Sequence, residues 1–291
     1  MIEMTLKNYR EKIDNRLDLL MPVGNNAYSG VIEAARYSLF AGGKRIRPIL
    51  LLEFYKLFGG DDDCAYNFAC AIEMIHTYSL IHDDLPCMDD DDMRRGKPSN
   101  HIKFGEPLAL LAGDALLTES FGVASRTLGI PSERVADAIT FLSKNAGING
   151  MVGGQVIDTC YEGDVDEDLL IKTHLLKTGA LIKAASVCGA ILAGADDESI
   201  KKVSEYAESV GLAFQIIDDL LDRQSTTEKL GKPVGSDQKN SKTTTVDLLG
   251  VEECERRAAA LTEKAIDILD GFDGDTTVLK ELTGYLLKRN Y

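Results

Sequence analysis

Two aspartate-rich clusters contain the side chains of this chain that are best suited to chemistry. The first lies at 82–92, with the order His-Asp-Asp-Leu-Pro-Cys-Met-Asp-Asp-Asp-Asp, and the second is Asp-Asp-Leu-Leu-Asp at 218–222. An apolar stretch precedes each cluster, so both are expected at the ends of helices. Carboxylates gathered there repel one another and resist burial unless a cation neutralises them. Ligands that are all oxygen favour a hard ion, and magnesium that keeps some waters and bridges substrate phosphates is the usual case.

Basic residues stand where they could hold a phosphate beside those acids. Arg-Arg-Gly-Lys follows the first cluster at 94–97, and such side chains suit phosphate oxygens rather than a bare metal store. A second basic element, Gly-Gly-Lys-Arg-Ile-Arg-Pro at 42–48, joins a turn with open backbone N–H groups to Lys44 and Arg47 on one side of the next turn. The sequence therefore predicts a diphosphate between two magnesium-loaded patches and favours a second diphosphate site.

Helical geometry indicates which acids of the second cluster can act together. On an ideal helix Asp218 and Asp222 lie about 40° apart, one turn from each other, so they can share one metal region. Asp219 is turned away by about 100°. We therefore expect Asp219 to support a metal ligand rather than to be one.

The first cluster requires a break in its helix. Pro86 forbids a continuous helix, so we expect a loop that brings Asp89 back toward Asp83. His76 precedes Asp83 by seven residues and lies within about 20° of the same helical face. That position favours a phosphate-binding role for His76.

Apolar residues recur at helical spacing through nearly the whole chain, without the strict alternation that marks strands. The expected fold is therefore all-α, and residues 1–291 are expected to form a single domain because no Pro/Ser-rich linker divides them. The polar segment 223–245 is expected to be a surface loop. Helices are expected at 3–20, 25–41, 46–58, 62–84, 107–128, 132–151, 166–194, 196–222, 251–270 and 275–289.

Composition restricts the partners and the compartment. The net charge of −15 argues against nucleic acid as a partner, because no basic stripe could dominate such a field. The six cysteines form no CxxC pair and are expected to be reduced thiols of a cytoplasmic protein. Acids near the N-terminus argue against a secretion signal, and the longest apolar stretch, 181–195, is too short to span a bilayer. We expect a soluble protein without stable membrane insertion.

Four motifs, in this order, resemble those of the trans-isoprenyl diphosphate synthases. They are the basic element at 42–48, the aspartate-rich stretch 80–100, Lys-Thr-Gly at 177–179, and Phe-Gln-x-x-Asp-Asp-x-x-Asp at 214–222. The likeness is strongest to bacterial farnesyl diphosphate synthases, because four residues separate Asp84 from Asp89. It implies an isoprenoid synthase helical bundle around a deep central cavity, usually as a homodimer. It also implies head-to-tail condensation of isopentenyl diphosphate with dimethylallyl or geranyl diphosphate, which releases diphosphate.

The resemblance assigns a role to each matching residue. The residues implied to bind magnesium, with three ions per active site, are Asp83, Asp84, Asp89, Asp218 and Asp222. Those implied to grip the allylic diphosphate are Arg94, Lys177 and Lys232, with Lys242 near its phosphate. Those implied to hold isopentenyl diphosphate are Lys44, Arg47, His76 and Arg95. Thr178 and Gln215 are implied to face the cationic centre together with Lys177, and Gly153, Gly154, Gln155 and Asp158 match a segment to which we assign packing before chemistry.

The chemistry implied is ionisation of an allylic diphosphate. Magnesium and basic side chains stabilise charge that develops on the leaving diphosphate. The double bond of isopentenyl diphosphate then attacks the carbocation, and the departing diphosphate is the expected base. The cavity must exclude water, which would quench the cation.

One residue offers a prediction about product length. Tyr78 lies five residues before Asp83, and five residues of helix rise about 7.5 Å, so its ring should lie deeper in the cavity than the metals. In the resembling family an aromatic residue there, together with the four residues between Asp84 and Asp89, goes with a fifteen-carbon product, and Ser79 is the second candidate for setting chain length. We therefore expect farnesyl diphosphate, with geranylgeranyl diphosphate, of twenty carbons, as the alternative.

Three other functions compete with this interpretation. A terpene cyclase shares the first aspartate motif, but its second metal motif mixes Asn/Asp, Ser and Glu, unlike 218–222. A non-catalytic subunit of a heteromeric prenyl synthase would not need the intact acidic and basic sets. A calcium-binding structural protein would show an EF-hand loop, which the sequence lacks.

Overall fold

The structure is a computed structural model that describes residues 2–224 and 243–287. Helices form nearly all of its regular structure, and the all-α prediction is confirmed. The helices are α1 (Ile2–Leu20), α2 (Ser29–Leu39), α3 (Ile46–Leu57), α4 (Asp62–Asp83), α5 (Asn100–Phe104), α6 (Glu106–Ser125), α7 (Ser132–Ala146), α8 (Met151–Cys160), α9 (Glu167–His174), the π-helix η1 (Leu175–Gly179), α10 (Ala180–Ala193), α11 (Asp197–Gln224), α14 (Thr245–Leu249), α15 (Val251–Asp270) and α16 (Thr277–Leu287). Two-residue strands, β1 (Met93–Arg94) and β2 (Lys97–Pro98), pair antiparallel.

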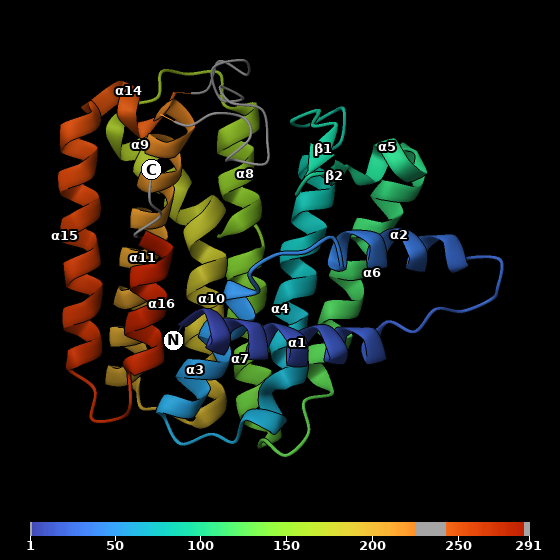
Figure 1. Cartoon of the computed structure of the whole chain (residues 1–291), viewed down its shortest axis with the longest axis horizontal. Helices are drawn as coiled ribbons and strands as arrows, with labels where there is room; N and C mark the ends of the chain where they lie inside the picture. Colours follow the sequence, from blue (N-terminus) through green and yellow to red (C-terminus); the bar gives the residue numbers. More distant parts are fainter. Residues whose placement is uncertain (1, 225–242, 288–291) are drawn as a thin grey trace.

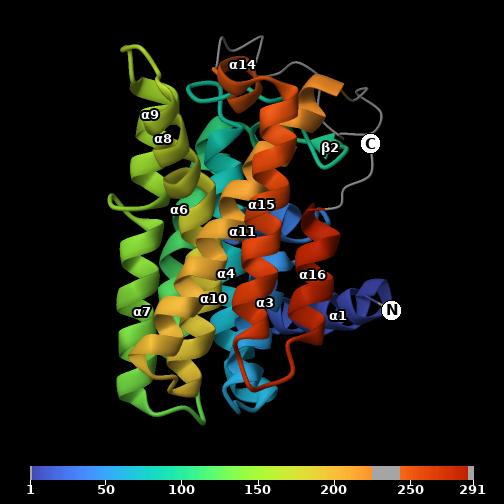
Figure 2. The same ribbon diagram turned by 90° about the vertical axis from the view of Figure 1, so that its left-hand side faces the viewer.

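The long helices lie side by side as a bundle, and α1 crosses them (Figures 1 and 2). Helix α4 packs against α3 and α6, α10 packs against α3, α7 and α11, and α15 covers the far side of α11. Both views place β1, β2, α8 and α14 toward one end of the bundle. The two aspartate clusters also reach that end, because α4 and α11 finish there.

The centre of the bundle is built from helices that are apolar on every side, as buried helices are. Eleven residues of α10 are buried, and the buried residues of α3 form a continuous run from Pro48 to Tyr55. These two helices approach closely because α10 carries Gly189. A Cβ atom there would lie 2.3 Å from the carbonyl oxygen of Leu51.

Several predicted boundaries were wrong where glycine or local capping divides the chain. The helix expected at 132–151 ends at Ala146, and Gly147 and Gly150 separate it from α8. Most of the loop expected at 223–245 lies outside the described residues, but α11 continues to Gln224 and an unexpected helix begins at Thr245. Thr244 and Asp247 form a capping box that starts α14. The hairpin of β1 and β2 was not predicted, since two residues are too few to show alternation.

By length and apolar composition alone, two helical stretches could cross a membrane, at 106–125 and 167–193. The second is longer than the apolar stretch that the sequence indicated, because α9, η1 and α10 form one continuous helix. It is 67% buried inside the protein, as the core helix of a soluble protein would be, whereas 106–125 is 39% buried. These stretches are weak evidence for a membrane protein.

Candidate active site

A cavity of about 670 Å³ lies between the end of α4, the loop after it, α8, η1 and α11. Both aspartate clusters contribute to its wall. Of the expected site residues, those that line it are Arg47, His76, Tyr78, Ser79, Asp83, Asp89, Arg94, Lys177, Thr178, Gln215 and Asp218. The expected residues that the structure describes but does not place on this wall are Lys44, Asp84, Arg95 and Asp222. Lys232 and Lys242 lie outside the described residues.

The loop after α4 brings two aspartates together, as Pro86 predicted. Helix α4 ends at Asp83, and the backbone N–H of Asp89 donates to the carbonyl oxygen of Asp83 at 2.9 Å. Both residues line the cavity. Burial raises the pKa of Asp83 to about 6, while the nearby Lys177 acts in the opposite direction. Burial therefore disfavours the ionised form of Asp83, which a bound cation would stabilise.

Asp84 differs from Asp83 in its position and in its hydrogen-bond partner. Its side chain is buried beside the cavity, and Arg94 donates to it from Nε at 2.8 Å and from Nη2. Burial raises the pKa of Asp84, and the bonds to Arg94 oppose that rise. Arg94 also pairs with Asp91 at 3.1 Å. Arg94 therefore reaches the cavity wall while it is held by two carboxylates.

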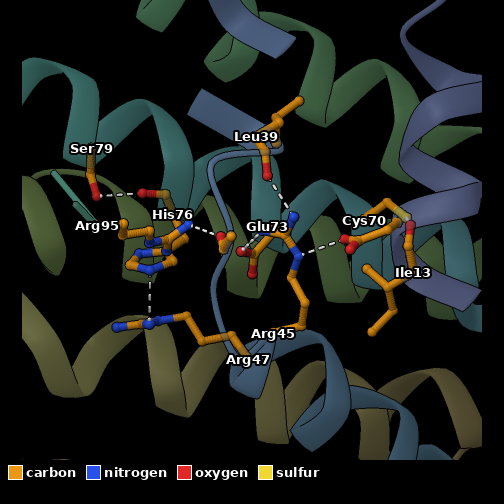
Figure 3. Close-up of polar contacts among 11 residues, drawn as sticks. Ile13, Leu39, Arg45, Arg47, Cys70, Glu73, His76, Ser79 and Arg95 are labelled. Carbon is orange, nitrogen blue, oxygen red and sulfur yellow. Dashed lines mark hydrogen bonds and ion pairs between the residues drawn. The ribbon is translucent and has the colours of Figure 1, made fainter. Parts of the chain in front are cut away.

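The basic part of the wall is made by Arg47 and His76, whose Nη1 and Nε2 atoms are 3.4 Å apart (Figure 3). Burial lowers the pKa of Arg47 to about 10. Burial, and then the charge of Arg47, lowers the pKa of His76 well below its usual value, so this imidazole is neutral near pH 7. The Nε atom of Arg47 is buried without a hydrogen-bond partner in the described part of the chain. An anion in the cavity could accept that bond.

Lys177 and Thr178 lie in the π-helical turn η1, and turns of this kind are frequent at functional sites. Glycines let two helices approach this turn closely. A Cβ atom on Gly154 of α8 would lie 2.2 Å from the backbone nitrogen of Lys177, and one on Gly211 of α11 would lie 2.8 Å from Gly179 Cα. The packing role expected for Gly154 is confirmed.

A chain of hydrogen bonds ties η1 to α11 and α14. Thr178 donates to Gln215 Oε1 at 3.1 Å, and Gln215 Nε2 donates to Asp219 Oδ1 at 3.0 Å. Asp219 Oδ2 then accepts from the backbone N–H of Thr245 at 2.8 Å and from its hydroxyl at 2.7 Å. Asp219 therefore supports Gln215 and α14, which agrees with its expected supporting position.

The carboxylates of the cavity wall fit a magnesium ion that is bound mainly by water and by substrate phosphate oxygens. Among the described residues, no three His, Cys, Asp or Glu side chains form a ready metal cluster. Magnesium commonly binds through one or two carboxylates together with water and phosphate oxygens. Such an ion would stabilise two groups of this structure. One is the Asp83 carboxylate, whose charge burial disfavours, and the other is the buried Oδ1 of Asp222, which has no hydrogen-bond partner within the described ranges.

Two wall residues were not predicted as functional. Asp158 was assigned to packing, yet its Oδ2 atom is 2.6 Å from Lys177 Nζ. His174 gave no signal in the sequence, but it lines the cavity, and its Nδ1 atom is buried without a partner among the described residues. Burial lowers the pKa of His174. Neither was visible in the sequence, because the surroundings of both depend on how α8, α9 and η1 pack together.

The model of the family described as polyprenyl synthetase matches residues 29–282. The chain belongs to this family. It is therefore a prenyltransferase of the head-to-tail kind, and the resemblance seen in the four motifs is confirmed.

Individual relatives cover almost the whole chain. A geranylgeranyl diphosphate synthase of Cyanophora paradoxa is 46% identical over 97% of this chain and 94% of its own length. A chloroplastic geranylgeranyl pyrophosphate synthase of Catharanthus roseus is 47% identical over 89% of this chain and 73% of its own length. A solved structure of a Helicobacter pylori geranyltransferase, complexed with magnesium and isoprenyl diphosphate, has a TM-score of 0.85 and 33% identity over 98% of this chain and 96% of that one.

Proposed function

We propose that this protein is a magnesium-dependent geranylgeranyl diphosphate synthase, which extends allylic diphosphates with isopentenyl diphosphate to twenty carbons. The observation that carries the product length is the 46% identity to the Cyanophora paradoxa enzyme of that name, across nearly both chains. This proposal replaces the farnesyl product that the sequence motifs favoured. Magnesium is supported by the donor set of the cavity and by the metal named for the Helicobacter pylori relative.

A second candidate is a farnesyl diphosphate synthase, and Tyr78 favours it. Among the described side chains of α4, those that line the cavity begin only at His76. Tyr78 is 7% exposed, and its ring meets His82 edge to face with centroids 5.7 Å apart. An aromatic ring there would stop a growing hydrocarbon tail early.

Product analysis distinguishes the two candidates. The enzyme is incubated with dimethylallyl diphosphate, labelled isopentenyl diphosphate and magnesium, and the dephosphorylated products are separated by chromatography. We expect mainly the twenty-carbon alcohol, and a dominant fifteen-carbon alcohol would overturn the geranylgeranyl proposal in favour of the farnesyl one. No magnesium-dependent product with either dimethylallyl or geranyl diphosphate would indicate a non-catalytic subunit.

Substitution of Tyr78 tests its part in product length. Tyr78→Ala should lengthen the mean product relative to wild type, because it removes a ring from the cavity wall. Tyr66→Ala is the matched control, because it removes a buried ring of the same helix that does not line the cavity, and its product distribution should equal that of wild type. An unchanged product distribution in Tyr78→Ala would show that another group limits the tail.

We assign the steps of catalysis to the residues of the cavity wall. Asp83, Asp89 and Asp218 would hold magnesium, with Asp84 and Asp222 behind them, and three ions would serve one active site. When bound, the metal neutralises charge that develops on the leaving diphosphate. The residues that would bind the allylic diphosphate are Arg94, Lys177, Lys232 and Lys242, and those that would bind isopentenyl diphosphate are Lys44, Arg47, His76 and Arg95.

Orientation of the cation would fall to oxygen atoms of the wall. The Thr178 hydroxyl donates to the side-chain amide oxygen Oε1 of Gln215, so the two oxygens are held together on the cavity wall. Their dipoles would stabilise the allylic cation, and Lys177, held by Asp158, would stay next to the departing diphosphate. The diphosphate would then take the proton lost from the new chain.

We also propose a cytoplasmic homodimer in which residues 1–291 form one domain. Helices α6 and α8 expose apolar side chains, with Leu111 outside the cavity and Leu110, Val152 and Val156 along its wall. Apolar patches of this kind mark protein interfaces. Light scattering on the purified protein should give twice the mass of the chain, and Leu111→Glu should shift it toward the monomer. A wild-type monomer would overturn the assembly but not the activity.

A further inference from the structure

Arg45 is a buried cation for which the catalytic scheme has no role. It is 2% exposed, and its backbone lies in the left-handed region at φ 54°. Its Nε atom donates to Asp14 at 2.8 Å, its Nη1 atom donates to Glu73 at 2.7 Å, and its Nη2 atom donates to the carbonyl oxygen of Leu39. Figure 3 shows Arg45 between Leu39 and Glu73, next to the contact of Arg47 with His76.

These contacts join four helices through one side chain. Asp14 belongs to α1, Leu39 ends α2, Arg45 precedes the first residue of α3, and Glu73 lies in α4. Burial disfavours the charge of Arg45, but Glu73 and Asp14 outweigh that effect and raise its pKa. The planar guanidinium meets its acceptors in fixed directions, so it sets the spacing of the helices as well as balancing charge.

Stability alone does not explain this arrangement. A buried ion pair loses hydration, and well-packed apolar residues often serve a core equally well. A left-handed backbone at a residue other than glycine is strained, and such strain persists where the surroundings enforce it, frequently at functional sites. Arg45 combines both costs immediately before α3, two residues ahead of Arg47. This combination is better explained by a need to hold the turn before α3 in a fixed position than by stability.

The turn before Arg45 has a shape that requires glycine, and it contacts Arg95. Gly42 and Gly43 have φ values of 105° and 126°. Arg95 donates to the carbonyl oxygen of Gly42, and a Cβ atom on Gly43 would lie 2.8 Å from Arg95 Nη1. Arg95 is itself left-handed, at φ 54°. The turn thus carries Lys44, contacts Arg95 and leads into Arg47, the three cations proposed for isopentenyl diphosphate.

Glu73 supplies the negative charge that this group of cations needs. It is 1% exposed and precedes His76 by three residues on α4. Burial lowers the pKa values of Arg47 and Arg95, and the charge of Glu73 raises both. The arginines also repel one another, since Arg95 lowers the pKa of Arg47. Glu73 therefore favours the charged state of cations that must stay close together before any diphosphate arrives.

We propose that the Arg45–Glu73 pair is the positioning element of the isopentenyl diphosphate site. The pair touches no substrate. It fixes the turn at 42–47 relative to α4, and so keeps Arg47 and Arg95 at the distance from His76 that a diphosphate requires. This inference rests on the proposed function, in which these residues bind isopentenyl diphosphate.

Arg45→Lys tests the pair with charge retained. An ammonium group cannot meet all three acceptors of the guanidinium fork, so the KM for isopentenyl diphosphate should rise about tenfold. The KM for the allylic substrate and kcat should stay within about twofold of wild type, because the aspartate and η1 walls are unchanged. The matched control is Arg36→Lys, which alters an arginine that donates to Asp18 and to the carbonyl oxygen of Met21, away from the cavity; both KM values should be unchanged.

Several outcomes of these kinetic measurements would contradict the proposal. Equal changes in both KM values, or none in a folded Arg45→Lys protein, would overturn the positioning role. If Arg45→Lys fails to fold, Glu73→Gln and Asp14→Asn replace it, and each should raise the KM for isopentenyl diphosphate selectively, by about threefold; no selective rise would overturn the proposal. Arg47→Ala separates the positioning role of Arg45 from the assignment of the binding site. An unchanged KM for isopentenyl diphosphate in Arg47→Ala would refute the assignment of the site itself.

Discussion

The two aspartate-rich walls of the cavity use the same side chain under different constraints. On the α4 wall the helix ends, and the loop after Pro86 brings Asp89 to Asp83, so that both acids line the cavity. On the α11 wall the helix continues through the cluster to Gln224. There Asp218 and Asp219 both line the cavity, and the carboxylate of Asp219 is held by Gln215 and Thr245.

The comparison shows that environment, not residue type, decides what an aspartate does. A carboxylate whose pKa is raised by burial, as that of Asp83 is, destabilises the folded state when it is ionised and favours a cation. A carboxylate that accepts three hydrogen bonds, as Asp219 does, contributes to the structure. The first kind suits metal binding and the second suits positioning.

The largest expected effect comes from removing an acid that faces the cavity. Asp83→Ala or Asp218→Ala should lower kcat by roughly three orders of magnitude, since loss of metal-assisted charge stabilisation costs several kcal/mol. Circular dichroism should show an intact fold, and the loss in Asp222→Ala should be milder. Nearly normal turnover in either of the first two folded variants would remove the distinction between facing and supporting acids.

The desolvation of Asp83 predicts a gain in stability when its charge is removed. Its pKa is about 6 in the folded protein against an ordinary value of 3.8, so its ionisation lowers the stability of the fold as the pH rises from about 4 to about 6. Without magnesium, Asp83→Asn should therefore be more stable than wild type at pH 7 by about 3 kcal/mol, and the difference should vanish below about pH 4. Urea unfolding across this pH range is the measurement. A variant less stable than wild type at pH 7 would contradict it.

Asp219 should behave in the opposite way. Asp219→Ala leaves the amide of Gln215 and the backbone N–H of Thr245 without their acceptor, which should lower the free energy of unfolding by about 2 kcal/mol. Thermal unfolding provides the measurement, and the decrease in kcat should be smaller than in Asp218→Ala. If Asp219→Ala abolished turnover without loss of stability, Asp219 would belong with the metal ligands.

The sequence predicted the parts of this molecule that depend on local periodicity. The helical bundle, the break at Pro86 and the shared face of His76 and Asp83 follow from spacing alone. The parts that depend on contacts between distant segments were not predicted. Neither the pairing of Asp158 with Lys177 nor that of Arg45 with Glu73 has a mark in the sequence, because each depends on how two helices approach.

A helix cap and a π-helical turn explain the remaining differences between the expected and the observed helices. Thr244 and Asp247 are a recognisable capping box, but the polar residues around them masked the short helix that they begin. The π-helical turn at 175–179 interrupts neither hydrophobicity nor helical content. Periodicity over a wide window therefore treats α9, η1 and α10 as one regular helix.

The π-helical turn at 175–179 also makes the protein sensitive to insertions and deletions at one place in its sequence. A π-helical turn holds an extra residue, so the helix beyond it is out of phase with the helix before it by about 100°. Deleting one residue within 175–179 would restore a regular helix between the same neighbours and would hardly alter a hydropathy profile. Yet it would rotate Lys177 away from Asp158 or Thr178 away from Gln215. Insertions and deletions in this segment should therefore silence the enzyme while leaving it folded, as few point substitutions outside the cavity could do.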